Sequence, residues 1–509
     1  MATDVILKNA NVITMNPAQP RAELVAISGD SIFHVGGNDE VDRLTGRFTK
    51  VIDCAGKTLV PGFHDAHLHL FSLIRKLTSL DLSPAKVRSI ADIKEAIRKV
   101  ATSKPPGAWI NGTDYNEFYL EGKHCPTRWD LDEAAPNHPV VISHRSLHAC
   151  VLNSKALELA GITNETPEPD GARIERDLAT GEPNGVLIGM LNFVRSHVMP
   201  RFTEDELIEG AALADEYFLS HGITSFQEAT MRNDIGRWET LCDLKLNADL
   251  LSRVTMMAGA DFWGDFKERG MRTGTGDNLM QLGAVKIMLE IEPEQEELNK
   301  LALDIHTAGY QLAFHAVDER TVASAVTALE YVNPHSSVAG RRHRIEHCGE
   351  CHPSLLERIK KLGLVIVTQP AFIYYSGERY LATVPGSQLP WLYRIKAPLE
   401  KGVVVAGSSD APVVSANPLM GIYAAVTRQA ESGQTLLPEE CISVDQALAL
   451  YTVNAAYSSF EEKVKGSIAP DMLADVVILN DDLTCVPPEK IKDIKVEMTM
   501  IGGEVVWEA

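Results

Sequence analysis

Long apolar stretches and clustered cysteines are both missing from this sequence. No run of 18 apolar residues occurs in the 509-residue chain, whereas a membrane-spanning helix needs about 20. The eight cysteines are scattered, which is typical of a reducing compartment and not of a disulfide-bonded scaffold. Cys348 and Cys351 form a CxxC pair. Because no second pair accompanies it, we interpret the spacing as chance and not as a zinc or redox site.

Basic residues are also in short supply. The chain has 48 Lys and Arg against 69 Asp and Glu, a formal net charge of −21. Nucleic acids and anionic membrane surfaces favour clustered Lys and Arg, so we expect neither as a partner. The N-terminus has no basic segment followed by an apolar one, and we therefore expect no signal peptide and a cytoplasmic protein. The sequence leaves the oligomeric state open, a homo-oligomer included.

Both ends of the chain have the pattern of short β-strands. Residues 4–15 and 23–35 alternate like strands around turn residues, and residues 475–479, 496–501 and 504–507 do the same. Neither end is long enough to bury a core alone. We therefore predict one small β-sandwich domain assembled from residues 1–60 and 466–509.

Strands alternate with amphipathic helices in the middle of the chain. The predicted strands are short and have the pattern of buried strands, at residues 59–69, 222–226, 253–257, 283–288, 310–315, 343–347, 364–369 and 403–407. Eight such βα units predict an α/β fold, a (β/α)₈ TIM barrel, over residues 61–465. That segment is much longer than the about 250 residues of a plain barrel. The excess follows the first strand, so we predict an inserted subdomain over residues 82–200.

Two histidines on the first predicted barrel strand carry the sharpest chemical signal. His67 and His69 lie two residues apart in Pro61-Gly-Phe-His-Asp-Ala-His-Leu-His. Side chains two apart on a strand project from the same face, so both imidazoles can reach one ion. An HxH pair alone is only moderately specific, since two structural histidines give the same pattern.

Polar residues at later strand ends strengthen the metal interpretation. Lys286 lies on the fourth strand, His315 on the fifth, His347 on the sixth, and Asp410 follows the eighth. Barrel enzymes place their chemistry at this C-terminal mouth, and imidazoles with a carboxylate are ligands that Zn²⁺ prefers. Singly, each has a structural alternative: a hydrogen-bonded core histidine, a lysine that reaches the surface, or an aspartate that caps a turn. Together they predict a metal site.

The sequence resembles the amidohydrolase superfamily, specifically its amidohydrolase-3 branch, which includes the N-substituted formamide deformylases. The resemblance covers nearly the whole chain. It rests on the motif around His67 and His69, and on Asn153-Ser-Lys-Ala-Leu, Gly181-Glu-Pro-Asn-Gly-Val, Arg342-His-Arg-Ile-Glu-His and Gly407-Ser-Ser-Asp-Ala-Pro-Val. It implies a TIM barrel with a β-sandwich built from both termini.

The resemblance also implies roles for the polar residues at the strand ends. The HxH pair would bind the more buried ion, Lys286 would be carboxylated and bridge two ions, and His315 and His347 would hold the second ion. Asp410 would bind metal and act as general base. We thus expect one or two divalent ions per chain, Zn²⁺ by the ligand set. The stretches after Lys286 (Met288-Leu-Glu-Ile-Glu-Pro) and after His315 (Ala316-Val-Asp-Glu) depart from the branch pattern. Because both border the mouth of the pocket, the departures affect the expected substrate more than the expected metal binding.

Together with the ligand set, the resemblance implies hydrolysis of a C–N bond in an amide, formamide or cyclic amide of a small molecule. A metal-activated water attacks, and Asp410 takes its proton and passes it to the leaving nitrogen. We expect substrate contacts from four residues near the mouth of the barrel. For each of them, a side chain that only packs against the protein is an equal alternative. These residues are His148 in the insertion, Asp261 and Trp263 after strand three, and Gln369 at the end of strand seven.

Two rival functions stay open at this point. A mononuclear heterocycle deaminase would use Asp318 or Glu319 as a proton shuttle, although Lys286 on strand four speaks against it. A non-catalytic binding protein on the same fold is the second rival, and the complete ligand set argues against it, since six buried polar groups are costly to keep together without a use. If Lys286 is unmodified, it would pair with an acid such as Glu290.

Overall fold

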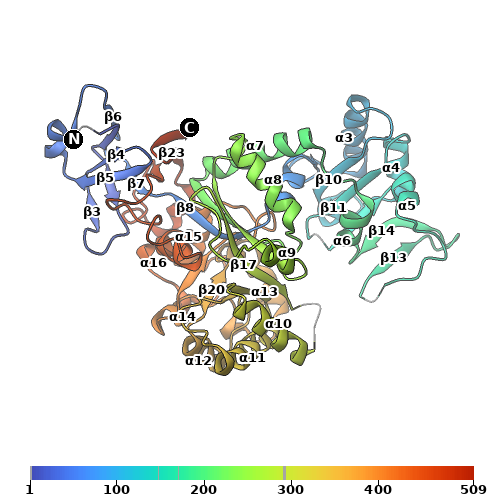
Figure 1. Cartoon of the computed structure of the whole chain (residues 1–509). Helices are drawn as coiled ribbons and strands as arrows, with labels where there is room; N and C mark the ends of the chain where they lie inside the picture. The colour runs from blue at the N-terminus through green and yellow to red at the C-terminus, as the bar shows by residue number, and fades with distance from the viewer. Residues whose placement is uncertain (1–2, 147, 170, 290–293) are drawn as a thin grey trace. The chain divides into compact units, whose positions relative to one another are not determined.

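The computed structural model describes residues 3–146, 148–169, 171–289 and 294–509. The chain forms two compact units, one of residues 1–73 with 211–509 and one of residues 74–210 (Figure 1). It crosses between them within helix α2 (Leu70–Leu77) and again within α7 (Glu204–Ser220). None of the helices in the described ranges is long and apolar enough to cross a membrane.

Eight parallel strands form the sheet of a TIM barrel in the first unit, as predicted. Their order is β8-β15-β16-β17-β18-β19-β20-β21. The strands are β8 (Phe63–Leu68), β15 (Ile223–Glu228), β16 (Arg253–Gly259), β17 (Met280–Met288), β18 (Leu312–Ala316), β19 (Arg344–His347), β20 (Val365–Thr368) and β21 (Val405–Gly407). Every residue of β8, β15, β16, β19, β20 and β21 is buried, apolar and polar alike, as expected for a parallel sheet that is covered on both faces.

Helices alternate with these strands. Those after the second to eighth strands are α8 (Ile235–Leu246), α9 (Trp263–Glu268), α10 (Gln295–Thr307), α11 (Glu319–His335), α12 (Pro353–Leu362), α13 (Ala371–Thr383), α14 (Lys396–Glu400), α15 (Pro418–Thr427), α16 (Val444–Leu450) and α17 (Val453–Ser458). Local signals set their ends. Asp318 caps α11 by accepting a hydrogen bond from Thr321 N at 2.8 Å, and Gly363 ends α12 in the left-handed conformation that glycine adopts without strain.

Strands from the two ends of the chain share one sheet, as predicted from the sequence. The order is β24-β23-β22-β7-β2-β3, and a second sheet has the order β5-β4-β1-β6. In the first sheet, β7 (Thr58–Pro61) lies between β2 (Asn11–Ile13) and β22 (Val476–Leu479). The remaining strands are β1 (Val5–Lys8), β3 (Arg21–Ala22), β4 (Leu24–Ser28), β5 (Ser31–Gly36), β6 (Lys50–Asp53), β23 (Val496–Ile501) and β24 (Glu504–Glu508), with α1 (Val41–Leu44) between β5 and β6.

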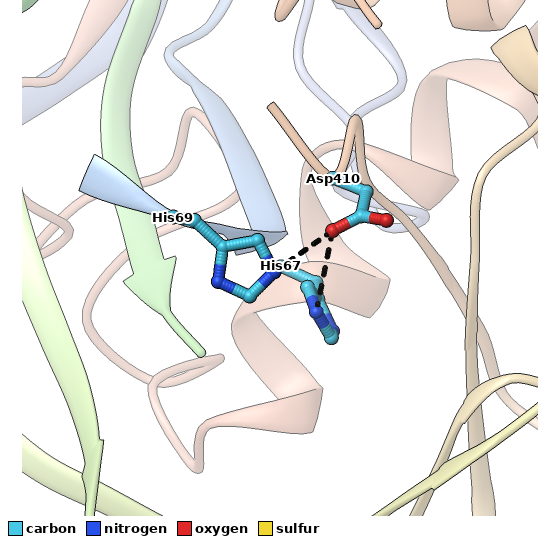
Figure 2. A group of neighbouring side chains, drawn as sticks. All are labelled: His67, His69 and Asp410. Carbon is cyan, nitrogen blue, oxygen red and sulfur yellow. Dashed lines mark ion pairs between the residues drawn. The ribbon is translucent and has the colours of Figure 1, made fainter. Parts of the chain in front are cut away.

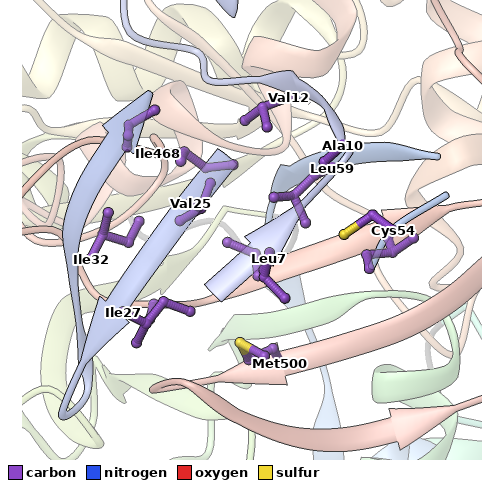
Figure 3. Close-up of a cluster of buried hydrophobic side chains, with 14 of the residues drawn as sticks. Leu7, Ala10, Val12, Val25, Ile27, Ile32, Cys54, Leu59, Ile468 and Met500 are labelled. Carbon is purple, nitrogen blue, oxygen red and sulfur yellow. The ribbon is translucent and has the colours of Figure 1, made fainter. Parts of the chain in front are cut away.

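The two terminal sheets enclose an apolar core. Leu7, Val25 and Ile27 from the N-terminal strands pack in one buried cluster with Ile468 and Met500 from the C-terminal segment (Figure 3). These sheets and the barrel belong to the same compact unit. The domain boundaries at residues 60 and 466 therefore stay a prediction.

The second unit has its own mixed sheet and its own core. The strand order is β13-β14-β12-β11-β10-β9. The strands are β9 (Leu80–Asp81), β10 (Ile110–Tyr115), β11 (Val140–His144), β12 (Ala149–Leu152), β13 (Arg173–Arg176) and β14 (Pro183–Ile188), with α3 (Ile90–Ser103), α4 (Arg128–Ala134), α5 (Ser154–Leu159) and α6 (Leu191–Phe193). This unit, residues 74–210, contains the whole segment 82–200 that the sequence indicates as an insertion.

Candidate metal centre

Three of the predicted ligands meet at the C-terminal end of β8. The ligand atoms of His67, His69 and Asp410 all lie within 4.8 Å of one another. Asp410 Oδ1 is 3.0 Å from His69 Nε2 and 3.7 Å from His67 Nε2 (Figure 2). The i, i+2 spacing on the strand thus brings both imidazoles to one carboxylate.

The other three predicted ligands extend this group. Lys286 Nζ lies 3.3 Å from His67 Nε2. His347 Nε2 lies 3.0 Å from His315 Nδ1, and the rings of His67 and His347 have centroids 5.0 Å apart. All six residues that the strand-end pattern singles out are therefore brought together in the first unit.

The second ring nitrogen of three histidines is held by an oxygen atom. His67 Nδ1 donates to Glu346, and His347 Nδ1 lies 2.8 Å from Gln369 Oε1. His69 Nδ1 lies 2.9 Å from Thr230 Oγ1. A metal-binding histidine characteristically donates its other N–H to such a partner, which fixes the tautomer and the ring orientation. In each of the three rings the nitrogen left for a ligand bond is Nε2.

Two residues do more here than the sequence indicates. Glu346 is fully buried and accepts hydrogen bonds from Arg344 at 2.7 and 2.9 Å as well as from His67. Gln369 is fully buried and also donates to Ser408 Oγ at 2.9 Å. The polar ends of both side chains are thus used to hold other protein groups. Glu346 is the residue before His347 in the Arg-Ile-Glu-His motif, the one signal that could have pointed to it.

Backbone geometry positions Asp410 and His347. Asp410 has φ 59° and His347 has φ 69°, a left-handed conformation that costs residues other than glycine about 1–3 kcal/mol. Asp410 N donates to His67 O at 2.9 Å, and His69 N donates to Ala411 O at 2.8 Å. These bonds pin the loop after β21 to β8, so the surrounding structure holds the unfavourable conformation in place.

Burial sets the protonation states of the group. It lowers the pKa of His347 to about 4 and the pKa of Lys286 to about 8, with Glu346 and Asp410 acting against it at Lys286. Burial alone would raise the pKa of Asp410, but His69, His347 and His67 outweigh it and hold this pKa below its usual value. At neutral pH the group therefore offers neutral imidazoles at His67 and His347 and an ionised carboxylate at Asp410, the forms that bind metal.

One oxygen in the group has no hydrogen-bond donor. Asp410 Oδ1 is buried and accepts a hydrogen bond from no group in the described ranges, although His69 Nε2 is near. An uncompensated buried carboxylate oxygen is costly. A cation between Asp410, His67 and His69 would satisfy it, so the residues present fit a divalent ion.

The predicted substrate contacts lie in several different places. Trp263 packs edge-on against the ring of Tyr310, with centroids 5.9 Å apart, and Asp261 is exposed. His148 is exposed on the second unit, and Gln369 contacts His347 as described above. All four stay predictions as substrate contacts. Glu290, the alternative partner of Lys286, lies outside the described residues.

Comparisons with known proteins agree with the sequence resemblance. A family model described as the amidohydrolase family, of the amidohydrolase-3 branch, matches residues 50–507. An N-substituted formamide deformylase of Arthrobacter pascens is 28% identical, over 99% of this chain and 98% of its own length. The YtcJ protein of Bacillus subtilis is 26% identical, over 98% of each chain.

A solved structure has the same fold. An uncharacterized metal-dependent hydrolase of Pyrococcus horikoshii superposes with a TM-score of 0.78 at 24% identity, covering 95% of this chain and 99% of its own. At that identity the likeness extends to the fold alone, and it agrees with the predicted TIM barrel.

Proposed function

The chain belongs to the amidohydrolase family, and on that premise we propose that it is a metal-dependent hydrolase of a C–N bond in a small molecule. The bond is that of an amide, a formamide or a cyclic amide. His67, His69, Lys286, His315, His347 and Asp410 form the metal site, and Asp410 is the general base and acid.

The convergence of the Nε2 atoms of His67 and His69 on Asp410, with the ring of His347 beside that of His67, carries this proposal. Each of these rings has its Nδ1 held by an oxygen, from Glu346, Thr230 or Gln369. Purely structural histidines have no reason to present their free nitrogens to one carboxylate. Imidazole and carboxylate donors suit zinc, and a bound divalent ion would supply Lewis acidity that lowers the pKa of a water and polarises a carbonyl.

Asp410 moves the proton in this reaction. Its lowered pKa keeps it ionised at neutral pH, so it can accept the proton of an attacking water. It then donates that proton to the leaving nitrogen, which is a poor leaving group as an amide anion. The backbone hydrogen bonds that join Asp410 to His67 and Ala411 to His69 hold Asp410 in the position where it does both.

Lys286 is proposed to carry a carboxyl group. Its side chain is buried, 1% exposed, and its pKa of about 8 leaves a substantial fraction as neutral amine. A neutral amine adds to CO₂, forming an N–C bond and losing one proton, and the carbamate has two oxygens and a negative charge. An unmodified ammonium is a poor ligand because it has no lone pair. We therefore propose two ions per chain.

The mononuclear deaminase has less support. Asp318 uses its carboxylate to cap α11, accepting hydrogen bonds from Thr321 N and Oγ1, and is therefore engaged at the start of that helix.

Formamides are the first substrates to test, because the deformylase of Arthrobacter pascens is named for acting on N-substituted formamides.

Metal analysis followed by a substrate screen tests the proposal. The wild type should contain two divalent ions per chain and hydrolyse a member of an N-formyl, N-acyl and cyclic-amide panel. Lys286→Ala should lose one ion and most turnover, with partial rescue by short carboxylic acids. Lys465→Met is the matched control, since Lys465 is also buried but pairs with Glu461 at 2.7 Å; it should keep both ions. Full metal content and turnover in Lys286→Ala, with deamination of an aminoheterocycle, would overturn it.

A further inference from the structure

The second unit contains a polar hollow among α2, β10, β11 and the turn after α6. It has about 20 Å³ of space for the centres of water-sized groups, and it is partly open to solvent. Its polar lining residues are Arg75, Lys76, Asn111, Thr113, Ser143 and Arg195, which we call the cationic hollow. None of them belongs to the candidate metal centre.

Two guanidinium groups share this hollow without an ion-paired acid. In the part of the chain that the structure describes, no carboxylate forms an ion pair with Arg75 or Arg195. Lys76, by contrast, pairs with Asp114 at 3.2 Å. Arg75 packs its guanidinium over the ring of Phe202, 4.4 Å from the centroid, which supports the side chain without neutralising its charge. Glu206 attracts Arg75 electrostatically without pairing with it, so the lining carries a net positive charge that is only partly balanced.

Burial makes that net charge unfavourable. It lowers the pKa of Arg75 to about 10, and the like charge of Arg195 adds to the effect. The pKa of Arg195 is lowered by burial as well. Partly buried like charges in one hollow destabilise the folded chain unless a counter-charge enters.

A buried amide completes the lining. Asn111 Oδ1 is buried and has no hydrogen-bond partner in the described ranges. The amide group of Asn111 is therefore not fully used by the protein. An amide can turn by a half rotation to present its NH₂ group as a donor instead. The hydroxyls of Thr113 and Ser143 lie in the same lining.

We propose that the cationic hollow binds a small oxyanion, a carboxylate or phosphate group held between Arg75 and Arg195. Planar guanidinium groups pair with the two oxygens of such an anion in a fork geometry that lysine cannot reproduce. Asn111 and the hydroxyl of Thr113 add neutral donors to the remaining oxygens, whereas Ser143 Oγ donates to Gly112 O at 3.2 Å. The hollow is small, so the anion is a free small molecule or one end of a larger one.

Calorimetric titration of the full-length protein with inorganic phosphate, and separately with acetate, tests the proposal at constant ionic strength. We expect saturable binding of at least one of them with one site per chain. Arg195→Gln and Arg75→Gln should each weaken it about tenfold or more, since a hydrogen bond to a charged group contributes about 1.5–3 kcal/mol. Arg195→Lys should weaken it less than Arg195→Gln but not restore it.

Arg173→Gln is the matched control, because Arg173 is an exposed arginine of the same unit and the charge change is the same. It should bind as the wild type does. Binding of phosphate alone would assign a phosphate site, and binding of acetate alone a carboxylate site. Two results would overturn the proposal: binding of neither anion, or unchanged binding in both glutamine variants.

Thermal melting distinguishes a variant that has lost the anion site from one that binds weakly because it is misfolded. Without anion, the double variant Arg75→Gln/Arg195→Gln should melt at the wild-type temperature or above, since two like charges are removed. A purely structural role for the arginines predicts the opposite, a lower melting temperature with and without anion.

Discussion

Replacing Glu346 with glutamine separates the two tasks that its buried carboxylate performs. Glu346 accepts one hydrogen bond from His67 Nδ1 and two from Arg344, at 2.7 and 2.9 Å. Glutamine keeps the shape but loses the charge. Arg344, 1% exposed, is then a buried cation without its carboxylate, and breaking a buried pair in this way costs about 3–5 kcal/mol.

The same change should weaken metal binding. Without a carboxylate at Nδ1, the tautomer and orientation of His67 are less fixed, and its Nε2 is a weaker ligand. Loss of such a partner typically lowers metal affinity about 10–100-fold. We therefore expect Glu346→Gln to lower the melting temperature of the metal-free protein and to raise the metal dissociation constant, measured by competition with a chelator, by that factor.

A second variant distinguishes these effects. In Arg344→Met/Glu346→Gln both charges are gone, so stability should recover in part while metal affinity stays low. Glu440→Gln is the control, since Glu440 is also a buried glutamate but accepts from the backbone of Ile395 and Ala397. It should change stability and leave metal affinity alone. An unchanged metal dissociation constant in Glu346→Gln would refute the positioning role.

Four further results are expected. Replacing His67 and His69 together with alanine should lower metal content by mass spectrometry while circular dichroism shows a folded barrel; stoichiometric metal in that variant would exclude them as ligands. Asp410→Asn should lower turnover about 100-fold or more, the range lost with a general base, and wild-type turnover would exclude that role. The lowered pKa of Lys286 makes the protonated amine predominate below about pH 8 and the neutral amine above it. Bicarbonate-dependent uptake of the second ion by metal-free protein should therefore rise as the pH passes through that value. An identical rise in Lys286→Met would contradict a role for the Lys286 amine. Deletion of residues 466–509 removes β22, which pairs with β7, so the truncated protein should be insoluble, and a soluble, active product would show that the two ends are independent.

The barrel and the six polar residues were predictable because each depends on a local pattern. All eight predicted strands are present, because short strand-forming segments that alternate with amphipathic helices are recognisable as βα units. His67 and His69 share a face because strand periodicity requires it. Lys286, His315, His347 and Asp410 could be grouped because parallel strands of a barrel end at the same mouth.

The partners that hold these side chains were not predictable in the same way. Glu346 contacts His67 across 279 residues of sequence, and no local pattern encodes that pairing. Gln369 was expected to contact substrate because it ends strand seven. Its position at the mouth is as expected, but its carbonyl oxygen is paired with His347. A strand-end position places a side chain near the chemistry without deciding which neighbour it binds.

The Glu346–His347 pair shows why the sequence alone could not reveal the full site. Neighbours on a regular strand point to opposite faces, so Glu346 and His347 should not reach the same centre. Glu346 and Arg344 share the inner face and contact β8 and β15 across the barrel. His347 ends the strand with φ 69°, and this left-handed turn brings its ring to 5.0 Å from that of His67. Cys348 N donates to Ala316 O at 3.0 Å directly after the turn, fastening it to the neighbouring strand. Because a strained residue persists only where its surroundings hold it, one backbone irregularity lets adjacent residues serve as positioning carboxylate and ligand.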